Sequence, residues 1–420
     1  MTGDAADLAR LRLGVFIAYA FNGFALASWS VRIPSISAQL GLTTAEVGGF
    51  LLAGALGTLV TVTIAGHAVQ RFGPRTTYLA ATAVFVLGYL LLGLAASALG
   101  LTVLLVANVL HGAAFALTNV PQSILSAEAE RRIGRTIIPQ FHASYSIGAA
   151  AGAGLGGLAA GVGLSVLAQF VITAVLAVLV RGLVVRFMGH RPHPSRADRA
   201  AARSAILAPE LPTGLSSPEA STGRARWLRY GRSSVWREPQ TLFIGLIVFG
   251  AALSEGAANN WMSVAVVDSF DAPVWQGAGA LTVFLVAQTI GRLLGGPLVD
   301  RFGRLTMLRL SGVVSVLGVL AFSTLPGLPF VIAGAALWGL GAALGVPISI
   351  AIAAADRLRG PSRVAAVTSL SSIANIAGPP VLGALGEVLG IRPAIGVIGV
   401  VLVIGVLLAR RAVGPAPRTR

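Results

Sequence analysis

Residues 295–304 read GGPLVDRFGR, a phrase that places one acid and two arginines between two long apolar runs. Residues 66–75 read GHAVQRFGPR, which is nearly the same phrase with Gln70 in the place of the acid. The aligned pairs are Gly66 and Gly296, Arg71 and Arg301, Phe72 and Phe302, and Gly73 and Gly303. A phrase that recurs at this interval predicts a chain built from two related halves.

The composition places the chain in a membrane. Of its 420 residues 55% are hydrophobic and only 11% are charged, whereas a soluble domain carries roughly 25% charged residues. All 31 basic residues are arginine, and cysteine is absent, which excludes disulfides and thiol chemistry. The net charge of +16 would suit nucleic acid, but the arginines are spread between apolar runs, so we expect no nucleic-acid partner.

The apolar runs predict an all-α membrane protein with twelve transmembrane helices in two six-helix, pseudo-symmetric halves. Each run is close to the roughly 20 residues that span a bilayer. The predicted spans are about 12–36, 46–69, 75–97, 100–126, 137–160, 163–187, 240–267, 275–299, 305–325, 328–355, 362–387 and 391–409. A transmembrane β-barrel is excluded because these runs are too long and do not alternate.

The arginines predict the orientation. If the N-terminus is inside, nearly every arginine that flanks a span falls on the cytoplasmic side, as the positive-inside rule requires. We therefore expect both termini in the cytoplasm, and a multi-pass protein of the bacterial inner membrane. Three regions follow: an N-terminal half at 1–187, a basic cytoplasmic linker at 188–239 and a C-terminal half at 240–420. The aromatic and arginine-rich part of the linker, 224–238, suits contact with anionic lipids, or is simply a solvated linker.

The repeated loop resembles the signature loop of the major facilitator superfamily, a G-x-x-x-D-R-x-G-R phrase between the second and third helices of a six-helix half. The match is close at 296–304 and degraded at 66–75. The resemblance covers the whole chain, and it implies the facilitator fold and transport by alternating access. It also implies that helices one, four, seven and ten line a central cavity, with contributions from helices two, five, eight and eleven.

Four further phrases resemble the branch of MosC-like proteins and distant relatives of fucose permeases. They are NGFALASWSVRIPSI at 22–36, FHASYSIGAAAGAGLGG at 141–157, SEGAANNWMS at 254–263 and AGPPVLGALGE at 377–387. The chain departs from the expected pattern where Asn119 and Asn260 replace acids. The chemistry of those acids is therefore not carried over.

The loop supplies the gating candidates. In the family this type of loop latches the two halves on the cytoplasmic side, which the resemblance assigns to Asp300, Arg301 and Arg304, with Arg71 in the first copy. Arg292 lies two turns deeper, about 12 Å by helix rise, and we expect it to be paired or to face the cavity. The alternative is that the loop arginines only fix the topology, but this leaves Asp300 unexplained.

Polar residues at membrane depth give the candidate solute site, because such groups usually face a cavity or a partner. On the fourth predicted helix, Phe115 and four polar side chains share one face. The substrate-binding candidates are Asn22, Trp29, Asn108, His111, Asn119, Gln122, His142, Tyr145, Asn259 and Asn375. Any single amide among them also suits interhelical hydrogen bonding, and Trp29, Trp261 and Trp338 suit either stacking on a sugar ring or anchoring at the interface. We expect the third, sixth, ninth and twelfth helices to lack polar groups deep in the membrane, apart from Gln169 and hydroxyls. Gly148, Gly152 and Gly156 are spaced by four residues, and we expect them to pack closely against another helix.

Glu255 is the acid that lies well inside a predicted span. A carboxyl there must be paired, hydrated or protonated, and one that neutralises easily suits coupling to protons. The alternatives are solute binding without a proton role, and a structural ion pair with Arg32 or Arg292.

The sequence thus predicts a secondary active transporter of a small polar, sugar-like solute that is driven by protons and works as a monomer. It predicts no enzyme, no cofactor and no metal site, because a phosphate-binding loop, a nucleophile elbow and a metal-ligand spacing are all missing from the sequence. The alternatives are a membrane solute sensor on the same scaffold and an efflux carrier for drugs or metabolites.

Overall fold

The computed structural model describes residues 3–134, 137–188, 235–355 and 359–413. These residues form helices and no strand, which confirms the predicted all-α membrane fold. By length and composition, nine helical stretches among them are able to cross a membrane, and one of these, Thr44–Ile133, is 90 residues long. The linker expected at 188–239 lies almost entirely outside the described residues, as does most of the segment expected to contact lipid.

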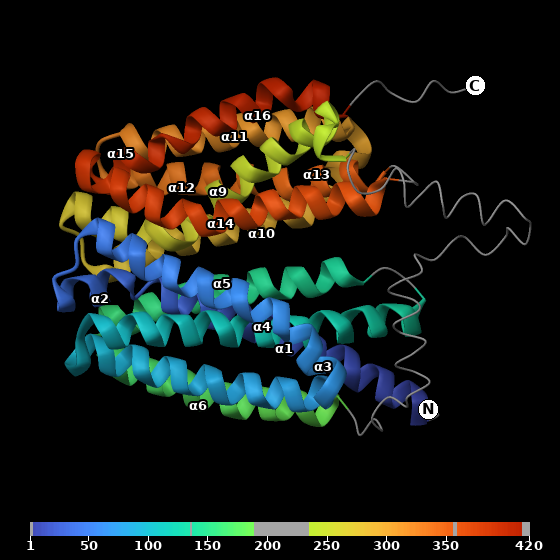
Figure 1. Ribbon diagram of the computed structural model, residues 1–420. Coiled ribbons are helices and arrows are strands. Elements are labelled where there is room, and N and C mark those ends of the chain that lie inside the picture. Colours follow the sequence, from blue (N-terminus) through green and yellow to red (C-terminus); the bar gives the residue numbers. More distant parts are fainter. Residues whose placement is uncertain (1–2, 135–136, 189–234, 356–358, 414–420) are drawn as a thin grey trace, which may run out of the picture.

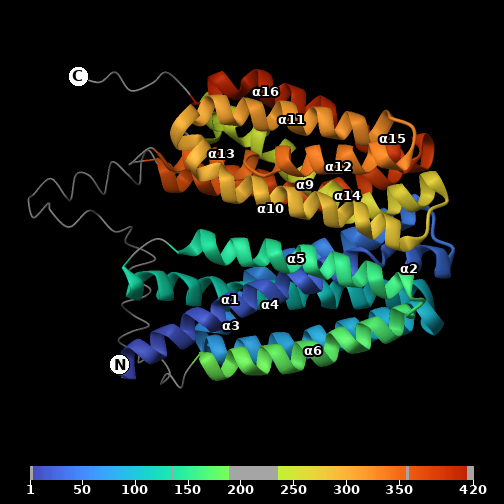
Figure 2. The same ribbon diagram turned by 180° about the vertical axis from the view of Figure 1, so that it is seen from behind.

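The helices form two bundles that lie side by side (Figure 1). The first bundle contains α1 (Gly3–Ser30), α2 (Ile33–Leu40), α3 (Thr44–Leu94), α4 (Gly100–Ile133), α5 (Ile138–Gly161) and α6 (Val166–Phe187). The second contains α9 (Pro239–Phe270), α10 (Val274–Phe302), α11 (Arg304–Thr324), α12 (Leu328–Ala342), α13 (Gly345–Ala354), α14 (Gly360–Leu389), α15 (Ile391–Gly396) and α16 (Ile398–Val413). We call them the N bundle and the C bundle. The view from behind shows the same separation (Figure 2).

The repeated loop has the same backbone in both bundles. Gly73 has φ 81° and ψ 161° and breaks α3 into two helices, while Gly303 has φ 79° and ψ 157° and separates α10 from α11. Only glycine adopts this region without strain. The guanidinium carbons of Arg71 and Arg301 each lie 5.3 Å from the ring centre of the following phenylalanine. The repeat seen in the sequence is therefore also a repeat in space.

Close glycine contacts hold α5 against α1 within the N bundle. A Cβ atom added at Gly148 would collide with the carbonyl of Ala20, and one added at Gly152 would collide with the carbonyl of Phe24. The close packing predicted for these glycines is confirmed.

The two bundles meet at the end opposite to the one where α1 begins and α16 ends. There α3 packs on α14, and a Cβ added at Gly383 would lie 2.7 Å from the carbonyl oxygen of Thr44. The backbone N–H of Ala45 also donates to Glu387 Oε2 across the bundles at 3.2 Å. We call this the closed end, and the end where α1 begins the linker end.

Candidate functional site

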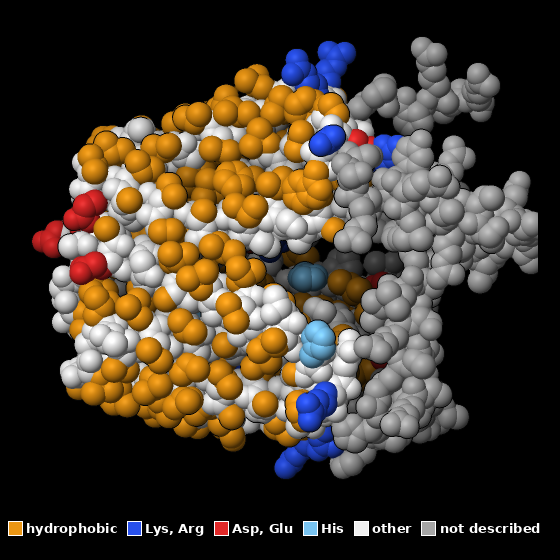
Figure 3. All heavy atoms as spheres, viewed as in Figure 1, with side chains coloured by type: hydrophobic (Ala, Val, Ile, Leu, Met, Phe, Trp, Pro, Cys, Tyr) orange, Lys and Arg blue, Asp and Glu red, His pale blue; other side chains and the backbone are white. Residues whose placement is uncertain are grey.

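A cavity of about 610 Å³ lies between the two bundles. Its walls come from α1, α3, α4 and α5 of the N bundle and from α9, α13 and α14 of the C bundle. In the space-filling view the surface is hollowed between the bundles toward the linker end (Figure 3). A cavity that is reached from one end and shut at the other is the arrangement that a carrier uses to expose its solute to one side at a time.

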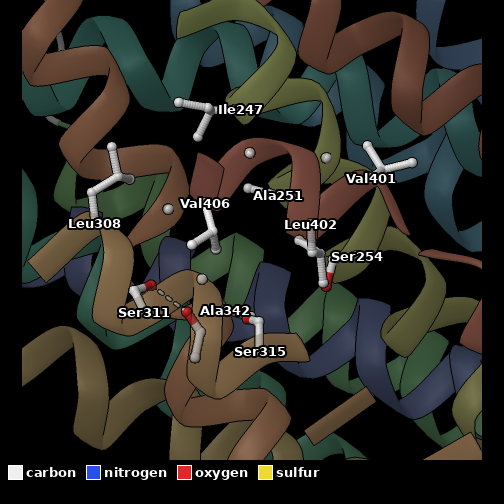
Figure 4. Close-up of a pocket in the computed structure, with 15 residues that line it drawn as sticks. Ile247, Ala251, Ser254, Leu308, Ser311, Ser315, Ala342, Val401, Leu402 and Val406 are labelled. Atoms are coloured by element: carbon white, nitrogen blue, oxygen red, sulfur yellow. Dashed lines mark hydrogen bonds between the residues drawn. The ribbon is translucent and has the colours of Figure 1, made fainter. Parts of the chain in front are cut away.

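A second pocket lies inside the C bundle, among α9, α11, α12 and α16 (Figure 4). Its volume is about 30 Å³, and its lining consists of apolar side chains, glycines and the hydroxyls of Ser254, Ser311 and Ser315. The Ser311 hydroxyl already donates to the carbonyl of Gly341. A space of this size holds about one water, so the larger cavity is the candidate site.

Seven of the residues expected from the sequence line the larger cavity. They are Trp29, Asn108, His111, Tyr145, Glu255, Asn259 and Asn375. The face predicted on the fourth helix is thus divided, because Asn108, His111 and Phe115 reach the cavity and its other two members do not.

Four expected residues do not line this cavity. Asn22 donates from Nδ2 to Oδ1 of Asn119 at 3.0 Å, so these two amides join α1 to α4. Gln122 is buried beside Leu11 of α1, and His142 is exposed, with its ring 5.2 Å from that of Tyr19. In this structure these four side chains lie outside the lining of the cavity, and their contact with a solute stays a prediction.

The aromatic wall of the cavity belongs to the N bundle. The rings of Trp29 and His111 stack with centres 5.1 Å apart and planes inclined by 16°. Trp261 and Trp338 lie elsewhere, fully buried in the C bundle, where the indole N–H of Trp338 donates to Ser254 Oγ at 2.7 Å. The expectation that these two tryptophans stack on a sugar or anchor at the interface is wrong, since both are core residues.

An ion pair stands beside the cavity. Arg292 Nη2 donates to Glu255 Oε1 at 2.9 Å, and the two side chains are 26% and 27% exposed. The other end of the guanidinium, Nη1, donates to Ser146 Oγ at 3.1 Å. Because Glu255 and Arg292 belong to the C bundle and Ser146 to α5, this small network crosses from one bundle to the other.

The pairing expected for Arg292 is confirmed, and its partner is the intramembrane acid. Sequence reasoning missed Ser146, although it lies one helical turn after the candidate His142. Asn259 does not hold the Glu255 carboxyl, because its Nδ2 donates to the backbone carbonyl of Glu255 at 2.9 Å.

A second buried arginine lies in the N bundle. Arg181 is 1% exposed, which contradicts the expectation that the sixth predicted helix carries only Gln169 and hydroxyls at depth. Its Nη1 donates to Thr118 Oγ1 at 3.1 Å, and its guanidinium carbon lies 4.3 Å from the ring centre of Phe85. Aromatic faces and a hydroxyl thus stabilise this cation.

The loop residues predicted to form a gate lie at the linker end. Asp300, Arg301, Arg304 and Arg71 are all exposed there. The cavity opens toward this end. A latch that joined the two halves here would therefore be open in this structure.

Among the described residues there is no group of three or more histidines or acids placed to hold a metal ion.

Comparison with known proteins agrees with this arrangement. The sequence profile described as Major Facilitator Superfamily matches residues 15–279 and 244–420. The chain is 27% identical to the uncharacterized transporter y4wD of Sinorhizobium fredii, over 94% of this chain and 96% of that protein. It is 24% identical to the membrane protein MosC of Rhizobium meliloti, over 92% of this chain and 86% of that protein.

Solved structures share the fold at low sequence identity. The nucleoside transporter NupG superposes with a TM-score of 0.70 at 16% identity and covers 95% of this chain and 98% of its own. A D-xylose-proton symporter superposes with a TM-score of 0.72 at 12% identity and covers 96% and 98%. The chain is a membrane transporter, not an enzyme, and it belongs to the major facilitator superfamily.

Proposed function

We propose that this transporter is a secondary active carrier that moves a small polar, sugar-like solute by alternating access and is driven by protons. The observation that carries the proposal is the Glu255–Arg292 ion pair at the wall of the cavity, with Arg292 also bound to Ser146 of the other bundle. A proton that binds Glu255 removes its negative charge, so Arg292 loses its partner. Protonation then acts directly on a contact between the bundles, which is what coupling requires.

The position of the pair supports this role over a purely structural one. About a quarter of each side chain is exposed, so protons reach the carboxyl from the cavity. A structural pair that only stabilised the C bundle would not need a hydrogen bond to Ser146 of the N bundle. One protein of the same fold is a D-xylose-proton symporter, which agrees with a proton-coupled carrier of a sugar-like solute.

Sidedness follows from the arginines of the loops. We place the linker end in the cytoplasm, so the structure is inward-facing and the closed end faces outward in a bacterial inner membrane. The exposed Arg301 and Arg304 then lie where anionic headgroups are found, and Asp300 with Arg71 completes the proposed gate. One chain encloses the cavity, so a monomer is sufficient.

The test uses protein reconstituted in liposomes with an imposed pH gradient. Wild-type protein should accumulate its solute only while the gradient lasts. Glu255→Gln, which mimics the protonated carboxyl, should abolish this accumulation and leave solute counterflow measurable. Gradient-driven accumulation by the Gln variant would assign the pair to structure alone.

A further inference from the structure

Two contacts join the bundles at the closed end, and they differ in charge. At one of them α3 packs on α14. At the other α5 packs on α10, where a Cβ added at Gly157 would lie 2.5 Å from the Cβ of Ala278 and one added at Gly161 would lie 3.4 Å from that of Trp275. Residues 154–161 and 274–282, which form the second contact, contain no ionisable side chain. Of these two contacts, only the one between α3 and α14 therefore carries a group that a proton can change.

Glycines bring α14 close enough to α3 for that group to act. A Cβ added at Gly383 would lie 2.7 Å from the Thr44 carbonyl oxygen, and one added at Gly386 would lie 3.0 Å from Thr44 Cγ2. Glu387 follows Gly383 by one helical turn, so the same approach places its carboxylate beside the first turn of α3. There Glu387 Oε2 accepts from the backbone N–H of Ala45 at 3.2 Å. A charged acceptor of the C bundle thus meets a backbone donor of the N bundle.

The other bonds in the first turn of α3 stay within the N bundle. Thr43 Oγ1 accepts from the N–H of Glu46 at 3.2 Å, and Glu46 Oε2 accepts from the N–H of Thr43 at 2.9 Å. The N–H of Ala45 is among the first of its helix, which have no carbonyl partner within the helix. Its protein partner is the carboxylate of the other bundle, and that bond is lost when the bundles separate here.

The charges around Glu387 do not replace this bond. Glu46 on α3 and Asp268 and Asp271 at the end of α9 are exposed, as Glu387 is, and Figure 3 shows acidic side chains on the surface at this end. Arg392 on α15 donates to two backbone carbonyls of the C bundle. Protons of the surrounding medium therefore reach Glu387 directly, and repulsion among acids of the two bundles opposes closure.

We propose that Glu387 and the N–H of Ala45 form an outer latch, which holds the closed end shut while the carboxylate is ionised and is released by a proton from the outer medium. A hydrogen bond to an ionised acceptor is roughly twice as strong as one to a neutral acceptor, so protonation weakens the latch without any movement of the backbone. The inference rests on the proposed function for its sidedness, since that function places the closed end outside. Glu387 then regulates how often the cavity opens outward, whereas Glu255 couples the movement to protons.

Distances across the closed end test the outer latch. Spin labels on cysteines at the exposed positions Leu99 and Leu325, one in each bundle, would report opening as a larger share of long distances in the solute-free full chain. Glu387→Gln keeps the shape of the side chain and removes its charge. At pH 8 this variant should show about a two- to fivefold larger open share than wild type, and wild type should approach the variant as the pH is lowered to 4. An open share in Glu387→Gln that equals that of wild type at pH 8, or falls below it, would overturn the proposal.

Glu46 provides the matched control. Its carboxylate belongs to the same turn of α3 and is equally exposed, but it bonds Thr43 of its own bundle. Glu46→Gln should therefore follow wild type or close slightly, because it only relieves repulsion between acids. If the acids did nothing but repel, Glu387→Gln would also favour the closed state. Equal effects of the two substitutions would contradict a latch at Glu387.

The measurement uses neither a solute nor a gradient, so it is separate from the coupling assay. A pH response that persists in Glu255→Gln and is lost in Glu387→Gln would support the outer latch even if gradient-driven accumulation were absent and the proposed coupling were wrong. A pH response that is lost in Glu255→Gln and persists in Glu387→Gln would overturn the latch and leave the coupling proposal standing.

Discussion

Arg292 Nη1 donates to Ser146 Oγ at 3.1 Å across the boundary between the bundles, while the same guanidinium holds Glu255. The bond joins α10 to α5 at the depth of the cavity. A contact of this kind stabilises the arrangement of bundles in which it forms, and it does so only as long as Arg292 keeps its position.

Ser146→Ala removes this bond, which contributes about 1 kcal/mol. We expect the variant to shift the population away from the state open at the linker end by about fivefold. Spin labels on cysteines introduced at Gln140 and Thr306, in this cysteine-free chain, would report the change as a larger share of short distances. Ser144→Ala is the control, because the Ser144 hydroxyl bonds the carbonyls of Phe16 and Phe141 within the N bundle. An unchanged distance distribution in Ser146→Ala would argue against the role of the bond.

The closed end depends on glycine. A Cβ at Gly48 would lie 3.0 Å from the Pro379 carbonyl oxygen, whereas one at the neighbouring Gly49 meets open space. Gly48→Val should therefore separate α3 from α14 and lower transport severalfold, and Gly49→Val should transport normally. Disulfide formation between cysteines placed at positions 45 and 387, where Ala45 and Glu387 now bond, would measure the separation. Equal crosslinking in the two valine variants would show that Gly48 does not hold this end shut.

Because the two copies of the loop have the same backbone, we expect the same substitution in each copy to destabilise the protein equally. Gly73→Ala and Gly303→Ala each place a side chain at a φ near +80°, which costs about 1–3 kcal/mol. Gly66→Ala and Gly296→Ala, at helical positions with open space around them, should match or exceed the wild-type melting temperature. The melting temperatures of the four variants test this prediction. A lower melting temperature for only one of Gly73→Ala and Gly303→Ala would contradict the structural equivalence of the repeats.

Much of the fold could be predicted from the sequence because the loop phrase is repeated. The two loop phrases and the apolar runs between them indicated paired six-helix halves, and their common backbone at Gly73 and Gly303 is what the repetition required. The sequence of the linker at 188–239 contains no comparable repeat, and a basic polar segment has no hydrophobic periodicity from which a structure could be predicted.

The candidate site was only partly predictable. Helical periodicity placed Asn108, His111 and Asn119 on one face, but it does not say how far the helix is rotated in its bundle, so the pairing of Asn119 with Asn22 was not foreseen. Arg181 lies near the end of an apolar run, where an arginine normally reaches the interface. Only the positions of Phe85 and its neighbours on other helices show why it is buried.

A cluster at the linker end makes stability depend on pH. Burial raises the pKa of Glu238, but hydrogen bonds from Arg363, Thr241 and Arg359 outweigh it, so the pKa is lowered overall. Arg363 Nε donates to Glu238 Oε2 at 2.8 Å, and Thr241 Oγ1 donates to the same oxygen at 2.9 Å. This bonding ties the start of α9 to the start of α14.

A carboxyl with a lowered folded-state pKa contributes stability above its unfolded pKa and loses it as the pH falls through the folded value. Glu238→Gln should therefore lower the melting temperature at pH 7 by a few degrees, and the difference from wild type should shrink as the pH falls below about 4. Melting curves between pH 3 and pH 8 test this. A difference that stays constant across the range would mean that the charge of Glu238 is not what stabilises the cluster.

The central claim is that Glu255 carries the coupled proton, and proton movement tests it most directly. The liposomes contain a weak buffer and a trapped pH-sensitive dye, and they start without a pH gradient. Solute is then added outside, so that it enters down its own concentration gradient. The account predicts that wild-type protein acidifies or alkalinises the lumen in step with solute entry, and that Glu255→Gln moves solute down its gradient with no pH change. A pH change of wild-type size in the Glu255→Gln variant would contradict the account.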